Sequence, residues 1–114
     1  MSKVFEMSFA RLYPVYINKL TRKGRTEAEL IQVTCWLTGY SKSELKKKIK
    51  GGVTLREFFD TCSLNPLADQ ITGSICGVKI QEIEDPLMKQ IRYLDKLVDE
   101  LAKGRPMEKV LRTI

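Results

Sequence analysis

Three capping-box motifs of the form [ST]-x-x-E follow one another within the first sixty residues of the chain. In each motif the hydroxyl can accept a hydrogen bond from the backbone N–H three residues later, while the glutamate reaches back to the N–H of the first residue. One such motif is weak evidence, but three at regular spacing predict three consecutive short helices. The motifs are Thr26–Glu29, Ser41–Glu44 and Thr54–Glu57.

Glycines in matching positions indicate where these helices stop. Gly39 follows the first predicted helix and the pair Gly51 and Gly52 follows the second, which is where glycine commonly ends a helix. We therefore predict helices over residues 27–38, 42–50 and 55–62.

An earlier helix is expected near Pro14, because apolar residues recur at helical spacing between Phe9 and Leu20. Proline has no N–H and its ring opposes an unbroken helix interior, but it is favourable in a first turn. We expect this helix to begin near Pro14 and to end before Gly24, with residues 8–13 as a separate turn.

The longest predicted helix covers residues 85–103. Asp85 is a suitable N-cap and Pro86 suits the first helical position. Pro106 opens a final short turn that contains Met107, Val110 and Leu111. The apolar residues of the long helix recur in steps of four and three, and they form a seam of Leu87, Ile91, Leu94, Val98 and Leu101.

Residues 69–83 are ambiguous between helix and strand. Val78 and Ile80 alternate as in a strand, yet Ile71, Ile75 and Val78 also fall on one helical row. Because no partner strand is evident elsewhere, we favour a helix for this segment, with Gly73 and Gly77 on a face where another helix can approach closely.

The elements together predict one all-α domain over residues 1–114, an orthogonal bundle of five to seven short helices. The length of 114 residues suits one domain, and the hydrophobic content of 43% suffices for a core. We expect that core to be built around Trp36, Leu37, Phe58, Phe59, Ile91 and Leu94.

Composition excludes several kinds of chemistry. The chain has no histidine, which excludes Ser-His-Asp catalysis and histidine-ligated zinc or haem. No metal or cofactor is expected. No apolar run is long enough to cross a bilayer and the first residues do not resemble a signal peptide, so we expect a cytoplasmic protein that does not enter membranes.

The three cysteines, Cys35, Cys62 and Cys76, form neither a disulfide framework nor a C-x-x-C motif, and we expect them to lie in or near the core as small hydrophobic residues. The segment GSICGVK lacks the spacing of a phosphate loop. One enzymatic alternative remains, in which Cys76 acts as a nucleophile beside Lys79.

Charge is distributed unevenly along the chain. Residues 1–56 carry 12 bases and 4 acids, while residues 57–114 carry 8 bases and 10 acids. Residues 27–50 partly match a helix-turn-helix, although Thr38 and Lys48 stand where that motif buries apolar residues. The candidate phosphate-binding residues are Arg22, Lys23, Arg25, Lys42, Lys46, Lys47 and Lys50.

Four stretches of the chain together resemble one bacterial family, the domain of unknown function 2200. They are FARLYPVYINKLTRKGRT, CWLTGY, ITGSICGV and EIEDPLMKQIRYLDKLVDELAKGRPMEKVL. The resemblance implies a small, mainly α-helical protein without an assigned activity or catalytic residues. The lysine run in SKSELKKKIKGG is more basic than is usual for the family, so the resemblance does not imply nucleic-acid binding.

We predict a non-catalytic binding or interaction module. Two kinds of partner are open: nucleic acid, bound weakly and without sequence preference through the basic N-terminal half, or a protein, including a second copy, bound through the seam of residues 87–101.

Overall fold

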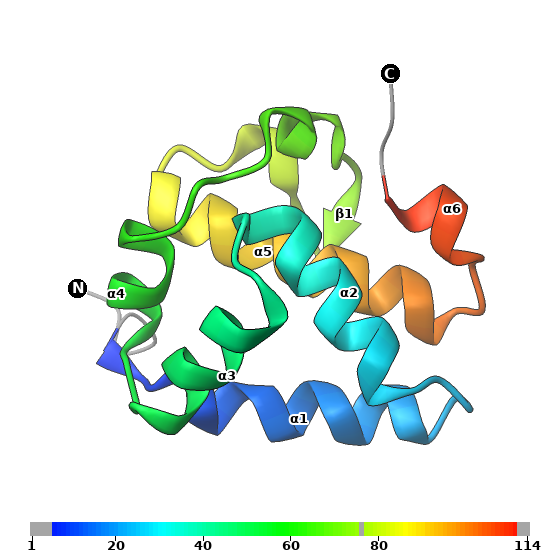
Figure 1. The fold of residues 1–114 in the computed structure, drawn as a ribbon. Coiled ribbons are helices and arrows are strands. Elements are labelled where there is room, and N and C mark those ends of the chain that lie inside the picture. The colour runs from blue at the N-terminus through cyan, green and yellow to red at the C-terminus, as the bar shows by residue number, and fades with distance from the viewer. Residues whose placement is uncertain (1–5, 76, 112–114) are drawn as a thin grey trace.

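The computed structural model describes residues 6–75 and 77–111 and shows a mainly α-helical fold (Figure 1). Helix α5 runs through the middle of the molecule and packs against α1, α2, α4 and α6, while α3 packs against α1 and α2. The helices are α1 (Phe9–Thr21), α2 (Glu27–Thr38), α3 (Lys42–Lys50), α4 (Leu55–Asp60), α5 (Pro86–Ala102) and α6 (Met107–Val110).

All three predicted capping boxes are present, with both reciprocal hydrogen bonds formed in each. The bounds predicted for α2 and α3 are confirmed. Helix α4 ends at Asp60, two residues earlier than predicted, and the Thr61 hydroxyl donates a hydrogen bond to the Glu57 carbonyl at 3.0 Å there. Local side chain–backbone contacts thus define these helices, as the motifs indicate.

The prediction for α1 was wrong at its beginning. The helix starts at Phe9, and Pro14 lies inside it. The N–H of Phe9 donates to the Val53 carbonyl at 2.8 Å, and its ring stacks on Phe58 with 4.0 Å between ring centroids. The Ser8 hydroxyl also accepts from the Arg11 N–H at 3.2 Å. This N-cap and the contacts with a distant part of the chain together hold the first turns helical although Pro14 supplies no N–H.

The helix favoured over residues 69–83 was also wrong. The segment contains the 3₁₀ helices η2 (Pro66–Gln70) and η3 (Ile80–Glu82) and, between them, the antiparallel strands β1 (Ser74–Ile75) and β2 (Val78–Lys79). Each strand finds its partner within the same segment. Gly77 has φ +80°, so it serves the tight hairpin turn rather than a helix–helix contact.

The hydrophobic core confirms five of the six predicted residues, because Leu37, Phe58, Phe59, Ile91 and Leu94 are at most 4% exposed. Trp36 is only half-buried, at the edge of the core. The face that α2 buries carries Leu30, Val33, Thr34, Leu37 and Thr38, and Trp36 lies beside that face.

Helix α5 is confirmed, and the Asp85 carboxylate caps it by accepting from the N–H groups of Leu87 and Met88. Its seam is occupied within the molecule. Ile91, Leu94, Val98 and Leu101 are all at most 4% exposed, and Leu87 is half-buried. We therefore do not propose that the protein associates through this seam, because the seam already packs into the core of the same molecule.

Candidate functional site

Helix α3 presents four exposed lysines, Lys42, Lys46, Lys47 and Lys50, which we call the lysine face. Residues four apart lie on the same side of a helix, so Lys42, Lys46 and Lys50 form one row and Lys47 lies beside it. Leu45 points the other way and is fully buried.

The remaining lysine of α3 helps to fix the helix in place. The Lys48 ammonium lies 5.6 Å from the centroid of the Tyr40 ring and donates to the Thr61 hydroxyl at 3.3 Å. The Tyr40 hydroxyl in turn donates to the Phe58 carbonyl at 2.6 Å. Lys48 therefore connects α3 to the end of α4, and the sequence pattern did not reveal this role.

The start of α3 is fixed by its capping box. The Ser41 N–H donates to the Glu44 carboxylate at 3.0 Å, and the Glu44 N–H donates to the Ser41 hydroxyl at 3.1 Å. These hydrogen bonds, more than the nearby Lys48 and Lys47, lower the pKa of Glu44. Glu44 is therefore ionised at neutral pH and is occupied with capping.

Helices α2 and α3 are joined by Gly39, Tyr40 and Ser41 alone, which gives a helix, a three-residue turn and a second helix. Thr38, polar where a helix-turn-helix is apolar, is fully buried, and its hydroxyl donates to the Thr34 carbonyl at 2.7 Å. Burial of Thr38 is therefore compatible with this arrangement, since its hydroxyl has a partner.

None of the four lysines makes an ion pair with a carboxylate in the part of the chain that the structure describes. Other cations of the molecule do: Lys19 and Lys103 both contact Asp99, at 3.3 and 3.0 Å. The lysine face therefore concentrates positive charge that the fold itself does not neutralise.

The other candidate cations do not join this face. Arg25 is half-buried and pairs with Glu29 at 2.6 Å, so it stabilises the start of α2. Arg22 and Lys23 are exposed and follow the last turn of α1, whereas α3 lies beside the first half of that helix (Figure 1). The candidate phosphate-binding residues thus form three groups: the lysine face, the exposed pair Arg22 and Lys23, and Arg25, which is paired with a carboxylate within α2.

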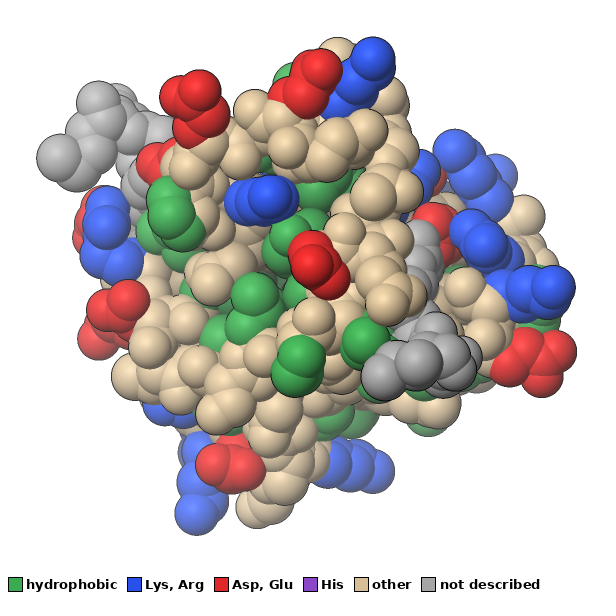
Figure 2. All heavy atoms as spheres, turned by 90° about the horizontal axis from the view of Figure 1, so that it is seen from above, with side chains coloured by type: hydrophobic (Ala, Val, Ile, Leu, Met, Phe, Trp, Pro, Cys, Tyr) green, Lys and Arg blue, Asp and Glu red, His purple; other side chains and the backbone are tan. Residues whose placement is uncertain are grey.

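The side of the molecule that faces away from α1 carries charges of both signs (Figure 2). Figure 2 looks down on the side away from α1 and shows basic and acidic side chains interspersed around a hollow lined with hydrophobic side chains. No single sign of charge dominates that view.

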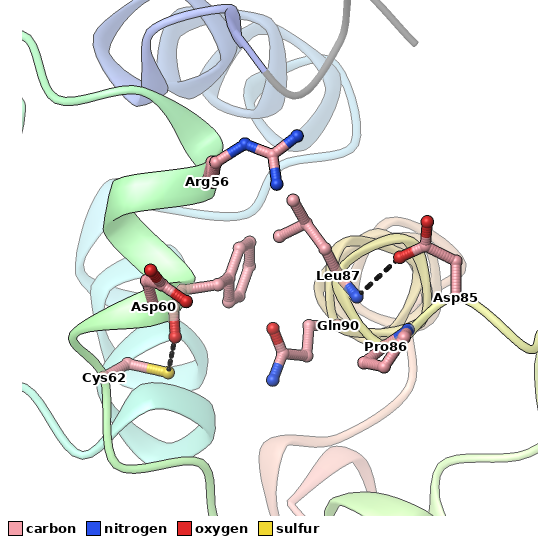
Figure 3. A pocket seen from close by; sticks show the side chains of 8 residues that line it. Arg56, Asp60, Cys62, Asp85, Pro86, Leu87 and Gln90 are labelled. Carbon is pink, nitrogen blue, oxygen red and sulfur yellow. Dashed lines mark hydrogen bonds between the residues drawn. The ribbon is translucent and has the colours of Figure 1, made fainter. Parts of the chain in front are cut away.

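A pocket of about 450 Å³ lies between α4 and the beginning of α5. Figure 3 shows the side chains of Arg56, Leu87 and Gln90 extending into it. Two charged side chains of the pocket have structural partners, because Arg56 pairs with Glu6 at 3.2 Å and Asp85 caps α5. We therefore assign no ligand to this pocket. It is lined by Arg56, Phe59, Asp60, Cys62, Asp85, Pro86, Leu87 and Gln90.

The described cysteines are poor nucleophiles. Cys35 and Cys62 are unbridged and half-buried, and burial raises the pKa of both thiols. A reactive cysteine needs the opposite shift. The third cysteine, Cys76, lies outside the described residues, whereas Lys79 is exposed on β2.

Two further features concern the whole described part of the chain. It contains no group of three or more Cys, Asp or Glu side chains placed to hold a metal ion. None of its helices combines the length and hydrophobicity that crossing a bilayer requires.

The molecule is a small, mainly α-helical protein. Comparison with known proteins narrows this class: the chain belongs to the family described as uncharacterized proteins conserved in bacteria (DUF2200), whose model matches residues 3–112. The predicted family resemblance is thereby confirmed.

A solved structure has the same fold. The crystal structure of the uncharacterized protein SP1917 is similar over 97% of this chain and 93% of that chain, with 48% sequence identity and a TM-score of 0.91. None of the curated proteins matches the chain.

Proposed function

We propose that the chain is a non-catalytic binding module that holds the phosphates of nucleic acid through the lysine face of α3. The observation that supports this function is the arrangement of Lys42, Lys46, Lys47 and Lys50, all exposed and none paired with a carboxylate among the described residues. Leu45 and Lys48 fix the helix from its other side.

The expected affinity follows from counterion release. Lysines that neutralise phosphates release the cations condensed on the nucleic acid, so binding weakens steeply with salt. Contacts to phosphates alone give dissociation constants of about 10⁻⁴ to 10⁻⁶ M. Four contacts predict a slope of about −3.6 for log K against log salt, which is a loss of about 150-fold between 50 and 200 mM salt.

The test is a titration of a labelled DNA duplex over this range of salt, with the protein and two double variants. Lys46→Gln with Lys50→Gln removes two contacts and should reduce the slope to about −1.8. Lys79→Gln with Lys109→Gln is the matched control, because it removes two exposed lysines outside α3 and leaves the same net charge.

The control variant should bind like the unchanged protein. Absence of binding at low salt would contradict the proposal, and so would a control that loses as much affinity as the α3 variant, since net charge alone would then explain the binding. Circular dichroism of each variant confirms that the fold is retained.

A non-catalytic role is part of this proposal. It is supported by the absence of histidine and by the raised pKa of Cys35 and Cys62. Cys76 is tested by alkylation at neutral pH, where a single fast-reacting thiol at that position would restore the enzymatic alternative. A cytoplasmic location is proposed with it, because nucleic acid is accessible there.

A further inference from the structure

The exposed side of α3 offers lysines but no other free side chain that distinguishes bases. Bases in the major groove are read mainly by arginine or lysine on guanine, by asparagine or glutamine on adenine, and by acidic side chains that accept from cytosine. Helix α3 has no arginine, asparagine or glutamine. Its one acid, Glu44, is held at the Ser41 N–H, and its exposed Ser43 carries a hydroxyl that does not discriminate between bases.

The described surface also lacks a platform for unpaired bases. Proteins that hold single strands stack successive bases on exposed aromatic side chains. In residues 6–75 and 77–111 every aromatic side chain is buried except Trp36, which is half-buried. Lysine is therefore the group that α3 offers to a nucleic acid, and its ammonium binds phosphate as a point charge on a flexible stem.

The spacing of the lysine row matches such a backbone. Successive members of the row Lys42, Lys46 and Lys50 are separated by about 6 Å along the helix, because each residue adds 1.5 Å. Successive phosphates of one duplex strand are about 7 Å apart once the winding of the strand is added to its rise of 3.4 Å. Flexible lysine stems can accommodate the small difference.

We propose that α3 lies along one strand of a nucleic-acid duplex, with Lys42, Lys46 and Lys50 on successive phosphates and Lys47 beside them. The protein then binds duplexes of any sequence in preference to single strands. This inference rests on the proposed function and adds to it the kind of nucleic acid and the orientation of the helix.

Counterion release sets the size of the preference. Each phosphate contact contributes about 0.9 to the salt slope on a duplex and about 0.7 on a single strand. With equal affinity for both at about 1 M salt, this difference for four contacts amounts to about tenfold tighter duplex binding at about 50 mM salt. A helix that reads bases in the major groove would instead bind some duplex sequences more tightly than others.

The first experiment compares binding of labelled DNA by fluorescence anisotropy at about 50 mM salt. The probes are a duplex, each of its separate strands, and two duplexes of unrelated sequence. The expected result is about tenfold tighter binding to the duplexes than to the strands, with the three duplexes equal within about threefold.

The second experiment tests the row itself. Lys46→Gln removes the middle contact and should lower the duplex salt slope by about 0.9. Lys79→Gln is the matched control, because Lys79 is exposed on β2 and is not part of the lysine face, and it should leave the slope unchanged.

The outcomes separate the two proposals. Equal binding of duplex and single strands, a preference of more than tenfold for one sequence, or equal effects of the two variants would overturn the alignment of α3 while leaving phosphate binding in place. Absence of binding to every probe would overturn the proposed function as well.

Discussion

Gly39 illustrates how much a single residue can decide. It ends α2 with φ +75°, and a Cβ atom at this position would lie 2.8 Å from the carbonyl oxygen of Ser63. The segment that contains Ser63 also caps α2. The Ser63 N–H donates to the Thr38 carbonyl and the Asn65 N–H donates to the Leu37 carbonyl, each at 2.8 Å. A side chain at position 39 would push against the backbone that satisfies the end of the helix.

We predict that Gly39→Ala destabilises the protein by about 2–4 kcal/mol, of which about 1–2 is the cost of the left-handed conformation. Gly24→Ala is the matched control: Gly24 also has φ +75°, but nothing lies within 4 Å of an added Cβ. Urea unfolding of both variants measures the difference. Equal losses would show that the contact with Ser63 costs nothing.

Asp99 connects two helices through charge, since it contacts Lys19 of α1 and Lys103 after α5. Burial by itself would raise the pKa of this carboxyl group, but the hydrogen bonds and charges of Lys103 and Lys19 outweigh burial and lower it. A carboxyl group with a lowered pKa stabilises the folded state above its unfolded pKa of about 4, and this stabilisation is lost as the pH falls through the folded pKa.

Asp99→Asn should therefore lower stability at pH 6 and make the decline in stability below about pH 4 shallower. The measurement is the free energy of unfolding by urea as a function of pH. A variant whose curve runs parallel to that of the unchanged protein would show that Asp99 does not contribute to acid sensitivity.

At the scale of the element, α1 is the helix whose sequence most disfavours its observed conformation, because a proline lies inside it. Pro14 lies at its sixth position, so the Ala10 carbonyl receives no hydrogen bond from residue 14 and the ring crowds the preceding turn. The contacts of Phe9 with Val53 and Phe58 compensate for this cost.

Pro14→Ala should consequently stabilise the protein, by about 2 kcal/mol once the greater freedom of alanine in the unfolded chain is subtracted. Pro14 is exposed, so the change removes little packing. Thermal unfolding followed by circular dichroism measures the shift. Unchanged or lower stability would indicate that α1 tolerates the proline without strain.

At the scale of the whole molecule, the fold raises the pKa of all four tyrosines. Burial is the main cause that raises the pKa of Tyr13, Tyr16, Tyr40 and Tyr93. Carboxylates reinforce the effect for all four, since the charge of Glu44 acts on Tyr40 and that of Asp69 on Tyr93. The other two also donate hydrogen bonds to carboxylates, Tyr13 to Glu27 at 2.9 Å and Tyr16 to Asp95.

A tyrosine whose pKa is raised by folding contributes stability that is complete below its unfolded pKa of about 10 and is lost as the pH rises toward the folded value. We predict that phenolate absorbance appears together with loss of the helical circular dichroism signal. Tyr16→Phe should make the alkaline decline of stability shallower. Phenolate that titrates near pH 10 in the folded protein would contradict this prediction.

Local patterns in the sequence determine much of this protein. The capping boxes and the apolar period of α5 each involve residues within one or two turns, so the helices at 27–38, 42–50 and 86–102 could be predicted almost to the residue. The same helical period placed Lys42, Lys46 and Lys50 on one solvent-facing row. The sequence alone therefore sufficed for the mainly α-helical class and for the lysine face.

Only the tertiary structure decided the remaining features, because each depends on how the elements pack together. Helix α1 begins at Phe9, where contacts with Val53 and Phe58 add to the local Ser8 cap. Trp36 lies at the edge of the core because α1, α3 and α5 pack against α2, whose buried face lies beside it. Strand β1, which pairs with β2, packs on α5, with the Lys96 ammonium donating to the Ser74 carbonyl at 3.3 Å. Packing of this kind overrides weak local preferences, and a one-dimensional pattern does not record which segments meet.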